Sequence, residues 1–175
     1  MSENVKSPDD SGSVVSHCYP PVLDACCGVR MFWFDKHDDR AVFIDNRCET
    51  FTHVRKDCGD KQIEVKPDRV MDFTDLQFPD NTFRLVVFDP PHVKAARGNV
   101  TKYYGTLSED WPQMIERGFS ECFRVLKPGG VLVFKWSETQ ISINKILTLT
   151  PEKPLFGHRV GARAKTHWVT FIKCG

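Results

Sequence analysis

The sequence predicts an α/β fold in which helices cover a mostly parallel sheet and the last strand runs antiparallel. Short, uniformly apolar segments alternate with turns and helix-forming segments along the 175 residues, as in parallel sheets that are buried on both faces. The last two apolar segments are separated by only a short basic turn, which favours antiparallel pairing. We expect one domain at 20–175, preceded by a disordered N-terminal tail at 1–19.

The first half of the chain supplies four of the expected strands. Each is a short apolar segment that ends near an acidic residue or a turn. The segments are residues 22–25, 41–46, 63–73 (in part) and 84–89. Between them we expect a short helix or turn at 29–39, a small hairpin within 47–62, and a turn at 78–83, where Pro, Asp and Asn are typical turn residues.

The second half begins with a long polar loop at 92–110, and loops of this length in a compact domain are usually functional or disordered. A helix follows, with Ser108 as its expected cap, and runs to about Leu126, where Lys-Pro-Gly-Gly ends it. Its apolar residues recur at the 3–4 spacing of one buried face. They are Met114, Ile115, Phe119, Cys122, Phe123 and Leu126. The remaining expected elements are a strand at 131–136, a helix at 138–149, and closing strands at 154–158 and 167–173.

Composition indicates the chemical setting. The chain is 41% hydrophobic and 27% charged with a formal net charge of +1, so overall charge does not indicate a polyanionic partner. Seven cysteines without a Cys-x-x-Cys pair predict reduced thiols and no metal site. No apolar run approaches the roughly 20 residues that span a bilayer. We therefore expect a soluble cytoplasmic protein. The basic residues after Glu152 either face phosphate or lie on a solvated hairpin.

Four acidic residues lie at or just beyond the ends of the expected strands. They are Asp24, Asp45, Asp72 and Asp89. Ligands of open α/β sheets bind at the carboxyl ends of the strands, so these carboxylates could line one crevice. Asp45 follows Asp24 by 21 residues, a spacing at which a carboxylate meets ribose hydroxyls in nucleotide sites. The sequence contains no phosphate-binding loop, which favours a nucleoside ligand without a pyrophosphate.

These features together resemble the class I S-adenosylmethionine-dependent methyltransferases. The resemblance covers residues 20–173 and is carried by the segments VLDACCG, VFIDN, MDFTDLQFPDNTFRLVVFDPPH and VLKPGGVLVFKW. It implies a three-layer Rossmann-like methyltransferase fold with S-adenosylmethionine as cofactor. The residues that it assigns to the cofactor are Asp24, Ala25, Cys26 and Gly28 for the methionine part, Asp45 for the ribose, and Asp72 and Phe73 for the adenine.

The turn after the first strand departs from the pattern of this family. The usual turn has three glycines, whereas here only Gly28 remains, with Cys26 and Arg30 at the other two positions. We expect Arg30 to point to solvent, and the alternative is that it contacts the cofactor carboxylate.

The segment Asp-Pro-Pro-His at 89–92 is similar to the Asp-Pro-Pro-aromatic motif of amino-methyltransferases that act on adenine in DNA or RNA. The resemblance implies that Asp89 and the Pro90 carbonyl accept the N–H groups of an exocyclic amine, and Pro91 makes the turn rigid. His92 stands where an aromatic ring stacks on the base, which must first leave its helix. In the following loop Lys102, Tyr103 and Tyr104 are expected to form a lid that stacks on a base and holds a phosphate.

Two other functions remain open. Asp89 and Lys135, with Lys36 as a possible first lysine, also look like part of the Lys-Asp-Lys-Glu arrangement of ribose 2′-O methyltransferases, in which a lysine deprotonates the hydroxyl. The third alternative is a catalytically silent cofactor-binding scaffold. The chain ends soon after the last expected strand, without a target-recognition segment. We therefore expect an enzyme that acts on nucleic acid with low specificity or with a protein partner, or on a structured RNA or a smaller molecule.

Overall fold

The computed structural model describes residues 19–53, 59–94, 100–159 and 165–175. The expected disordered tail, apart from Tyr19, and most of the basic turn between the closing strands lie outside these residues. Within them, no helix is long and apolar enough to cross a membrane.

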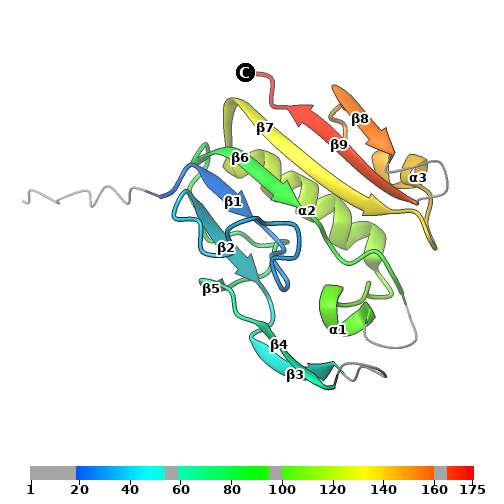
Figure 1. The fold of residues 1–175 in the computed structure, drawn as a ribbon. Coiled ribbons are helices and arrows are strands. Elements are labelled where there is room, and N and C mark those ends of the chain that lie inside the picture. The colour runs from blue at the N-terminus through cyan, green and yellow to red at the C-terminus, as the bar shows by residue number, and fades with distance from the viewer. Residues whose placement is uncertain (1–18, 54–58, 95–99, 160–164) are drawn as a thin grey trace, which may run out of the picture.

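A seven-stranded sheet forms the centre of the protein, in the order β5-β2-β1-β6-β7-β9-β8 (Figure 1). Its strands are β1 (Val22–Asp24), β2 (Ala41–Asp45), β5 (Arg69–Val70), β6 (Phe83–Phe88), β7 (Leu126–Ser137), β8 (Phe156–Arg159) and β9 (Thr166–Ile172). The first five of these strands pair in parallel, and β9 pairs antiparallel with both β7 and β8. The mostly parallel sheet with an antiparallel C-terminal strand is therefore confirmed.

The remaining elements lie around this sheet. They are the hairpin β3 (Glu49–His53) and β4 (Lys61–Val65), and the helices α1 (Val100–Tyr104), α2 (Trp111–Val125) and α3 (Ile143–Leu147). In Figure 1, α1 and the hairpin lie beyond the ends toward which β1, β2 and β6 point. Both are therefore placed at the sheet edge where α/β folds bind ligands.

Several element boundaries differ from the sequence expectation. Residues 63–65 belong to the hairpin, so the expected third strand is reduced to the two residues of β5. The loop at 92–110 contains the short helix α1, and the expected helix at 138–149 is only α3. Ser108 does not cap α2: the N-cap residue is Asp110, without a side-chain cap bond, and the Ser108 hydroxyl instead contacts the Met114 sulfur.

Helix α2 covers one face of the sheet with the apolar stripe that its sequence predicts. Phe119 packs against Phe88 of β6 and Phe134 of β7, with ring centroids 5.5 and 4.9 Å apart. At Gly118 the helix comes so close that an added Cβ would lie 2.6 Å from the Phe88 ring, which leaves room only for glycine. On the other face of the sheet, the β1–β2 connection covers β2. Trp33 from this connection packs on Phe43 of β2, with ring centroids 4.7 Å apart.

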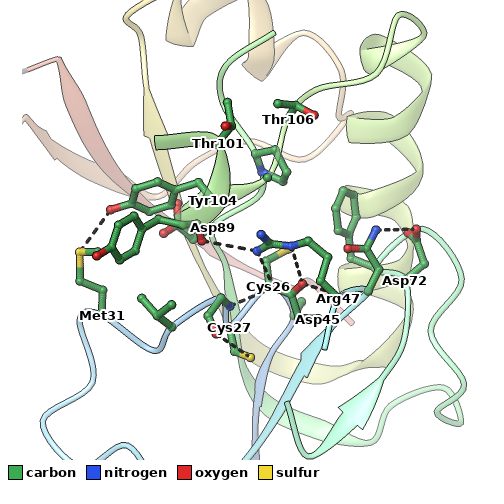
Figure 2. A pocket seen from close by; sticks show the side chains of 18 of the residues that line it. Cys26, Cys27, Met31, Asp45, Arg47, Asp72, Asp89, Thr101, Tyr104 and Thr106 are labelled. Carbon is green, nitrogen blue, oxygen red and sulfur yellow. Dashed lines mark hydrogen bonds and ion pairs between the residues drawn. The ribbon is translucent and has the colours of Figure 1, made fainter. Parts of the chain in front are cut away.

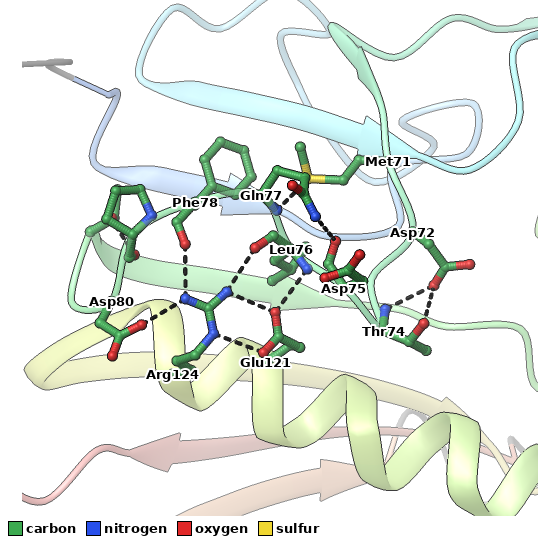
Figure 3. A network of polar contacts seen from close by, with 12 residues as sticks. Met71, Asp72, Thr74, Asp75, Leu76, Gln77, Phe78, Asp80, Glu121 and Arg124 are labelled. Carbon is green, nitrogen blue, oxygen red and sulfur yellow. Dashed lines mark hydrogen bonds and ion pairs between the residues drawn. The ribbon is translucent and has the colours of Figure 1, made fainter.

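An ion-pair network fixes the segment that leads from Asp72 back to the sheet (Figure 3). The Arg124 guanidinium on α2 makes two bonds of 2.7 Å to Glu121 and also donates to the carbonyls of Leu76 and Phe78. Glu121 in turn accepts the backbone N–H of Leu76. The turn at 76–80 is thereby tied to the helix.

Candidate active site

A cavity of about 520 Å³ opens at the carboxyl ends of β1, β2 and β6. Four segments supply most of its walls: the turn after β1, the end of β2 with Asn46, Arg47 and Glu49 after it, the residues just after β5, and the Pro-Pro turn after β6. Helix α1 and the residues after it close the remaining side (Figure 2). Six of the seven residues expected to hold the cofactor line this cavity. They are Ala25, Cys26, Gly28, Asp45, Asp72 and Phe73.

Asp24 is the seventh, and it lies beneath the cavity rather than in its wall. In the strand register Asp24 pairs with Phe43 and Val87, whereas Asp45 and Asp89 follow those partners by two residues. The Asp24 carboxylate is fully buried and accepts bonds from the Trp33 indole at 2.7 Å and the Cys26 backbone N–H at 3.2 Å. Burial raises its pKa to about 7, and these two bonds oppose the rise. Asp24 therefore holds the turn after β1 in place through the Cys26 backbone and Trp33.

Asp45 joins the turn after β1 to helix α1. Its carboxylate accepts the backbone N–H of Gly28 at 3.0 Å and that of Arg47 at 3.0 Å. The Arg47 guanidinium forms an ion pair with the same carboxylate at 3.0 Å and also donates to the carbonyl of Lys102 at 2.9 Å. A ribose bound to Asp45 would have to displace this guanidinium.

The turn after β1 needs glycine at only one position. Gly28 has φ +48°, and an added Cβ would lie 3.0 Å from the Tyr103 carbonyl oxygen, so the backbone passes close to helix α1. Arg30 also has positive φ, and the expectation that its side chain points to solvent is wrong. It is buried over the Phe43 ring and bonds the Asp68 carboxylate at 2.8 Å and the Lys66 carbonyl. The side chain fixes the turn from inside and is not among the residues that line the cavity.

The wall after β5 carries the groups expected at the adenine. Asp72 is exposed and accepts the backbone N–H and the hydroxyl of Thr74 at 2.8 and 2.7 Å. Its other oxygen accepts a long bond of 3.4 Å from the Asn46 amide. Phe73 is buried and packs edge-on against Phe88 at 5.3 Å.

Asp89 forms an ion pair with Lys135 on the neighbouring strand. Phe88 pairs with Phe134 in the β6–β7 register, so the next residues, Asp89 and Lys135, also lie beside each other. The Lys135 ammonium lies 2.5 Å from Asp89 Oδ2, and both side chains are largely buried. Burial raises the pKa of Asp89, and the ion pair with Lys135 opposes this rise.

His92 does not face the cavity in which a stacking ring is expected. Pro91 lines that cavity, and His92 lines a second, smaller one together with Asp89 and Lys135. The imidazole is buried against Tyr104, at 5.1 Å between ring centroids. Burial, together with the positive charge of Lys135, lowers the pKa of His92 to about 4. The ring is therefore neutral at neutral pH.

The expected lid residues are divided between the cavity and its outer side. Tyr103 and Tyr104 line the cavity, where the Tyr104 hydroxyl donates to the Met31 sulfur at 3.3 Å. The Tyr103 hydroxyl shares a hydrogen bond of 2.5 Å with His53 of β3. Lys102 is exposed and its ammonium lies 5.8 Å from the Phe51 ring, outside the cavity wall.

The site also contains residues that sequence reasoning missed. Trp33 bonds Asp24, Arg47 covers Asp45, and Met31 and His53 hold the two tyrosines. The signals available were an arginine two residues after a strand-end acid and an aromatic cluster after Gly28. Neither pattern specifies its partner, because each partner comes from another segment of the chain.

No protein-family model and no curated protein matches the chain. Its fold does match solved structures. The PH0226 protein from Pyrococcus horikoshii matches with a TM-score of 0.56 at 17% identity, over 87% of this chain and 81% of that one. An S-adenosylmethionine-dependent methyltransferase from Methanosarcina mazei matches at 0.54 and 14% identity, over 87% and 92%. The N-methyltransferase NodS from Bradyrhizobium japonicum matches at 0.53 and 12% identity, over 88% and 84%. The chain therefore has the Rossmann-like fold of S-adenosylmethionine-dependent methyltransferases.

Proposed function

We propose that this protein is an S-adenosylmethionine-dependent methyltransferase that methylates an exocyclic amine of a nucleobase, of the N6-adenine type, in DNA or RNA. One observation carries the proposal. The buried Asp89 carboxylate lies in the wall of a cavity that the six cofactor-type residues also line, and its Oδ1 has no hydrogen-bond partner among the described residues.

The residues of the larger cavity fit the proposed cofactor. Its volume of about 520 Å³ falls within the roughly 300–1,000 Å³ of small-molecule sites. Asp45 would bind the ribose hydroxyls once Arg47 moves, the Gly28 turn would lie along the methionine part, and Asp72 and Phe73 would hold the adenine. S-adenosylmethionine would supply an electrophilic methyl group, to which the acceptor nitrogen bonds as the carbon–sulfur bond breaks and a nitrogen proton is released.

The chain contributes mainly orientation and charge. An exocyclic amine conjugated to a ring is a weak nucleophile, and acceptors for its N–H groups draw it toward tetrahedral geometry. In our proposal Asp89 Oδ1 and the Pro90 carbonyl are these acceptors, and Pro91 holds the turn rigid. The sequence predicted that His92 stacks on the base, but His92 is not among the residues that line the larger cavity. We therefore assign this role to Tyr104, which lines both cavities. Lys102 remains available for a phosphate at the outer side of the lid.

The Asp89–Lys135 ion pair also favours the second candidate, methylation of a ribose hydroxyl. That mechanism uses a further lysine, and Lys36 does not supply it. The Lys36 ammonium donates to the carbonyls of Val29 and Arg30 and lies outside both cavity walls. The amine acceptor is therefore the first proposal.

Two measurements test the function. Isothermal titration with S-adenosylhomocysteine should show binding by the wild type and by Asp89→Asn. Tritiated S-adenosylmethionine with separate DNA, RNA and protein pools should label a nucleic acid, and Asp89→Asn should lose about 10²–10³-fold of this activity. Asp75→Asn, at an exposed carboxylate, is the matched control. Binding without labelling of any pool would instead favour the silent scaffold. We also propose that a protein partner supplies target recognition, and labelling that is strong only when cell extract is added would support this.

A further inference from the structure

A second cavity adjoins the larger one at Asp89. It has a volume of about 130 Å³ and shares two wall residues, Asp89 and Tyr104, with the larger cavity. The other residues that line it are His92, Lys135, Ser137 and Thr166. A group in the smaller cavity would therefore face a ligand in the larger cavity across the Asp89 carboxylate.

Two buried polar atoms in this wall have no hydrogen-bond partner among the described residues. They are Asp89 Oδ1 and His92 Nδ1. Buried polar atoms in folded proteins are nearly always paired, because an unpaired one loses its hydrogen bonds to water without replacement. A carboxylate oxygen can only accept hydrogen bonds, so the partner that Asp89 lacks is a donor.

Lys135 is held in place from three sides as well as by Asp89. Its ammonium lies 5.2 Å from the centroid of the Tyr104 ring, 5.5 Å from that of Phe32 and 5.8 Å from that of Trp168. Trp168 is the β9 register partner of Lys135, and the other two rings come from distant segments. Cation–π contacts of this kind stabilise a desolvated ammonium. The three rings and the ion pair hold the Lys135 ammonium at Asp89 Oδ2, so Asp89 Oδ1 is the oxygen that remains for a ligand.

The ionised form of Asp89 depends on this lysine. Burial raises the pKa of Asp89, and Lys135 is the group that opposes this rise. The other titratable groups around it do not help. Asp24 and Tyr104 carry no positive charge in either protonation state, the pKa of the half-buried Cys26 thiol is raised well above its usual value, and His92 is neutral. Without the ammonium, the pKa of Asp89 would rise further, and the protonated form offers one acceptor position fewer.

We infer that the smaller cavity receives the methyl acceptor as an amine, and that Lys135 is a positioning residue that keeps the free oxygen of Asp89 available to the amine N–H. This inference rests on the proposed function and names the chemistry of its acceptor. The volume suits an amino group with the edge of a small ring, and larger parts of the substrate would lie outside. A hydroxyl acceptor would instead need Lys135 to take up a proton.

The pH dependence of Lys135→Met separates these roles. At neutral pH the variant should lose about 100-fold of the nucleic-acid methylation. Activity should recover as the pH is raised, because Asp89 then ionises without the ammonium. Lys135→Arg should keep most activity, since it retains the charge. Loss by the same factor at every pH would overturn the inference, because either a proton-accepting lysine or a purely structural one gives that result.

Two readouts do not need turnover. In protein labelled with ¹³C at the Asp carboxyl carbons, the Asp89 signal, assigned by its loss in Asp89→Asn, should titrate at higher pH in Lys135→Met than in wild type. With saturating S-adenosylhomocysteine present, adenine and cytosine should bind the wild type better than hypoxanthine and uracil, which lack the amine. Equal binding of the four bases, or no binding of any, would overturn the inference.

The position of the acceptor has its own test. Ser137 lines the smaller cavity on the same strand face as Lys135, whereas Gly28 lines the larger one. Ser137→Leu should block binding of adenine and leave S-adenosylhomocysteine binding unchanged, and Gly28→Ala should weaken S-adenosylhomocysteine. Adenine binding that survives Ser137→Leu would refute the assignment of the cavity. Failure of the wild type to bind S-adenosylhomocysteine would instead refute the proposed function.

Discussion

Replacing Trp33 by Phe should destabilise the protein by an amount that grows with pH. The Trp33 indole donates to Asp24 Oδ2 at 2.7 Å, and Asp24 is fully buried. Phe keeps an aromatic ring against Phe43, where the ring centroids are 4.7 Å apart, but it removes the donor. Trp33→Phe therefore removes the hydrogen bond that the indole donates to Asp24 Oδ2.

The sign of the pH dependence follows from Asp24. Its pKa is about 7 in the folded protein and near 3.8 in the unfolded chain, so the folded state binds the proton more tightly. The stability that Asp24 contributes is therefore complete below about pH 3.8 and declines as the pH rises to about 7. A hydrogen bond to a neutral carboxyl is worth about 0.5–1.5 kcal/mol, and one to a carboxylate about 1.5–3 kcal/mol. Trp33→Phe should lose about 1 kcal/mol of this hydrogen-bond energy at pH 5 and about 2 kcal/mol at pH 8, added to a constant packing loss.

Urea unfolding at the two pH values measures the difference. Trp136→Phe is the matched control, because its buried indole donates to the Ile141 carbonyl at 2.9 Å, which does not titrate. The control should lose the same free energy of unfolding at both pH values. An equal loss for Trp33→Phe at pH 5 and pH 8, or a larger one at pH 5, would refute the reasoning about Asp24.

Two further substitutions test the contacts around the larger cavity. Arg47→Met should reduce the free energy of unfolding by about 1–3 kcal/mol, because the buried Asp45 carboxylate loses its ion pair. Calorimetry should also show S-adenosylhomocysteine binding several-fold more tightly, since no guanidinium competes with the ribose, and weaker binding would mean that Arg47 holds the ligand. Arg124→Met should cost about 2–3 kcal/mol in urea unfolding, since Glu121 and two carbonyls of the turn at 76–80 lose their donors. Arg124 lowers the pKa of Glu121, so this loss should shrink as the pH falls through the pKa of Glu121, and a loss below 1 kcal/mol at neutral pH would contradict the role of the network.

The sequence by itself determined the sheet and the place of the site. Uniformly apolar segments can be stable only as buried strands, and parallel strands present their carboxyl ends at one edge. The positions of Asp45 and Asp89 at one cavity could therefore be predicted from hydrophobic pattern and chain order, whereas Asp72 follows the short exposed strand β5 and was assigned by the family resemblance. Helix α2 was predictable for the same reason, because its apolar residues repeat at helical spacing.

Only the tertiary structure decided what each polar side chain contacts. Asp24 lies two residues deeper in the register than Asp45, which buries it beneath the cavity, and no local pattern encodes that register. The partners of Arg47 and Lys135 are set by where α1 and β6 approach them, over separations of 55 and 46 residues. Hydrophobic periodicity specifies which face of an element is buried. The direction of a charged side chain depends instead on the groups, distant in sequence, that replace its hydrogen bonds to water.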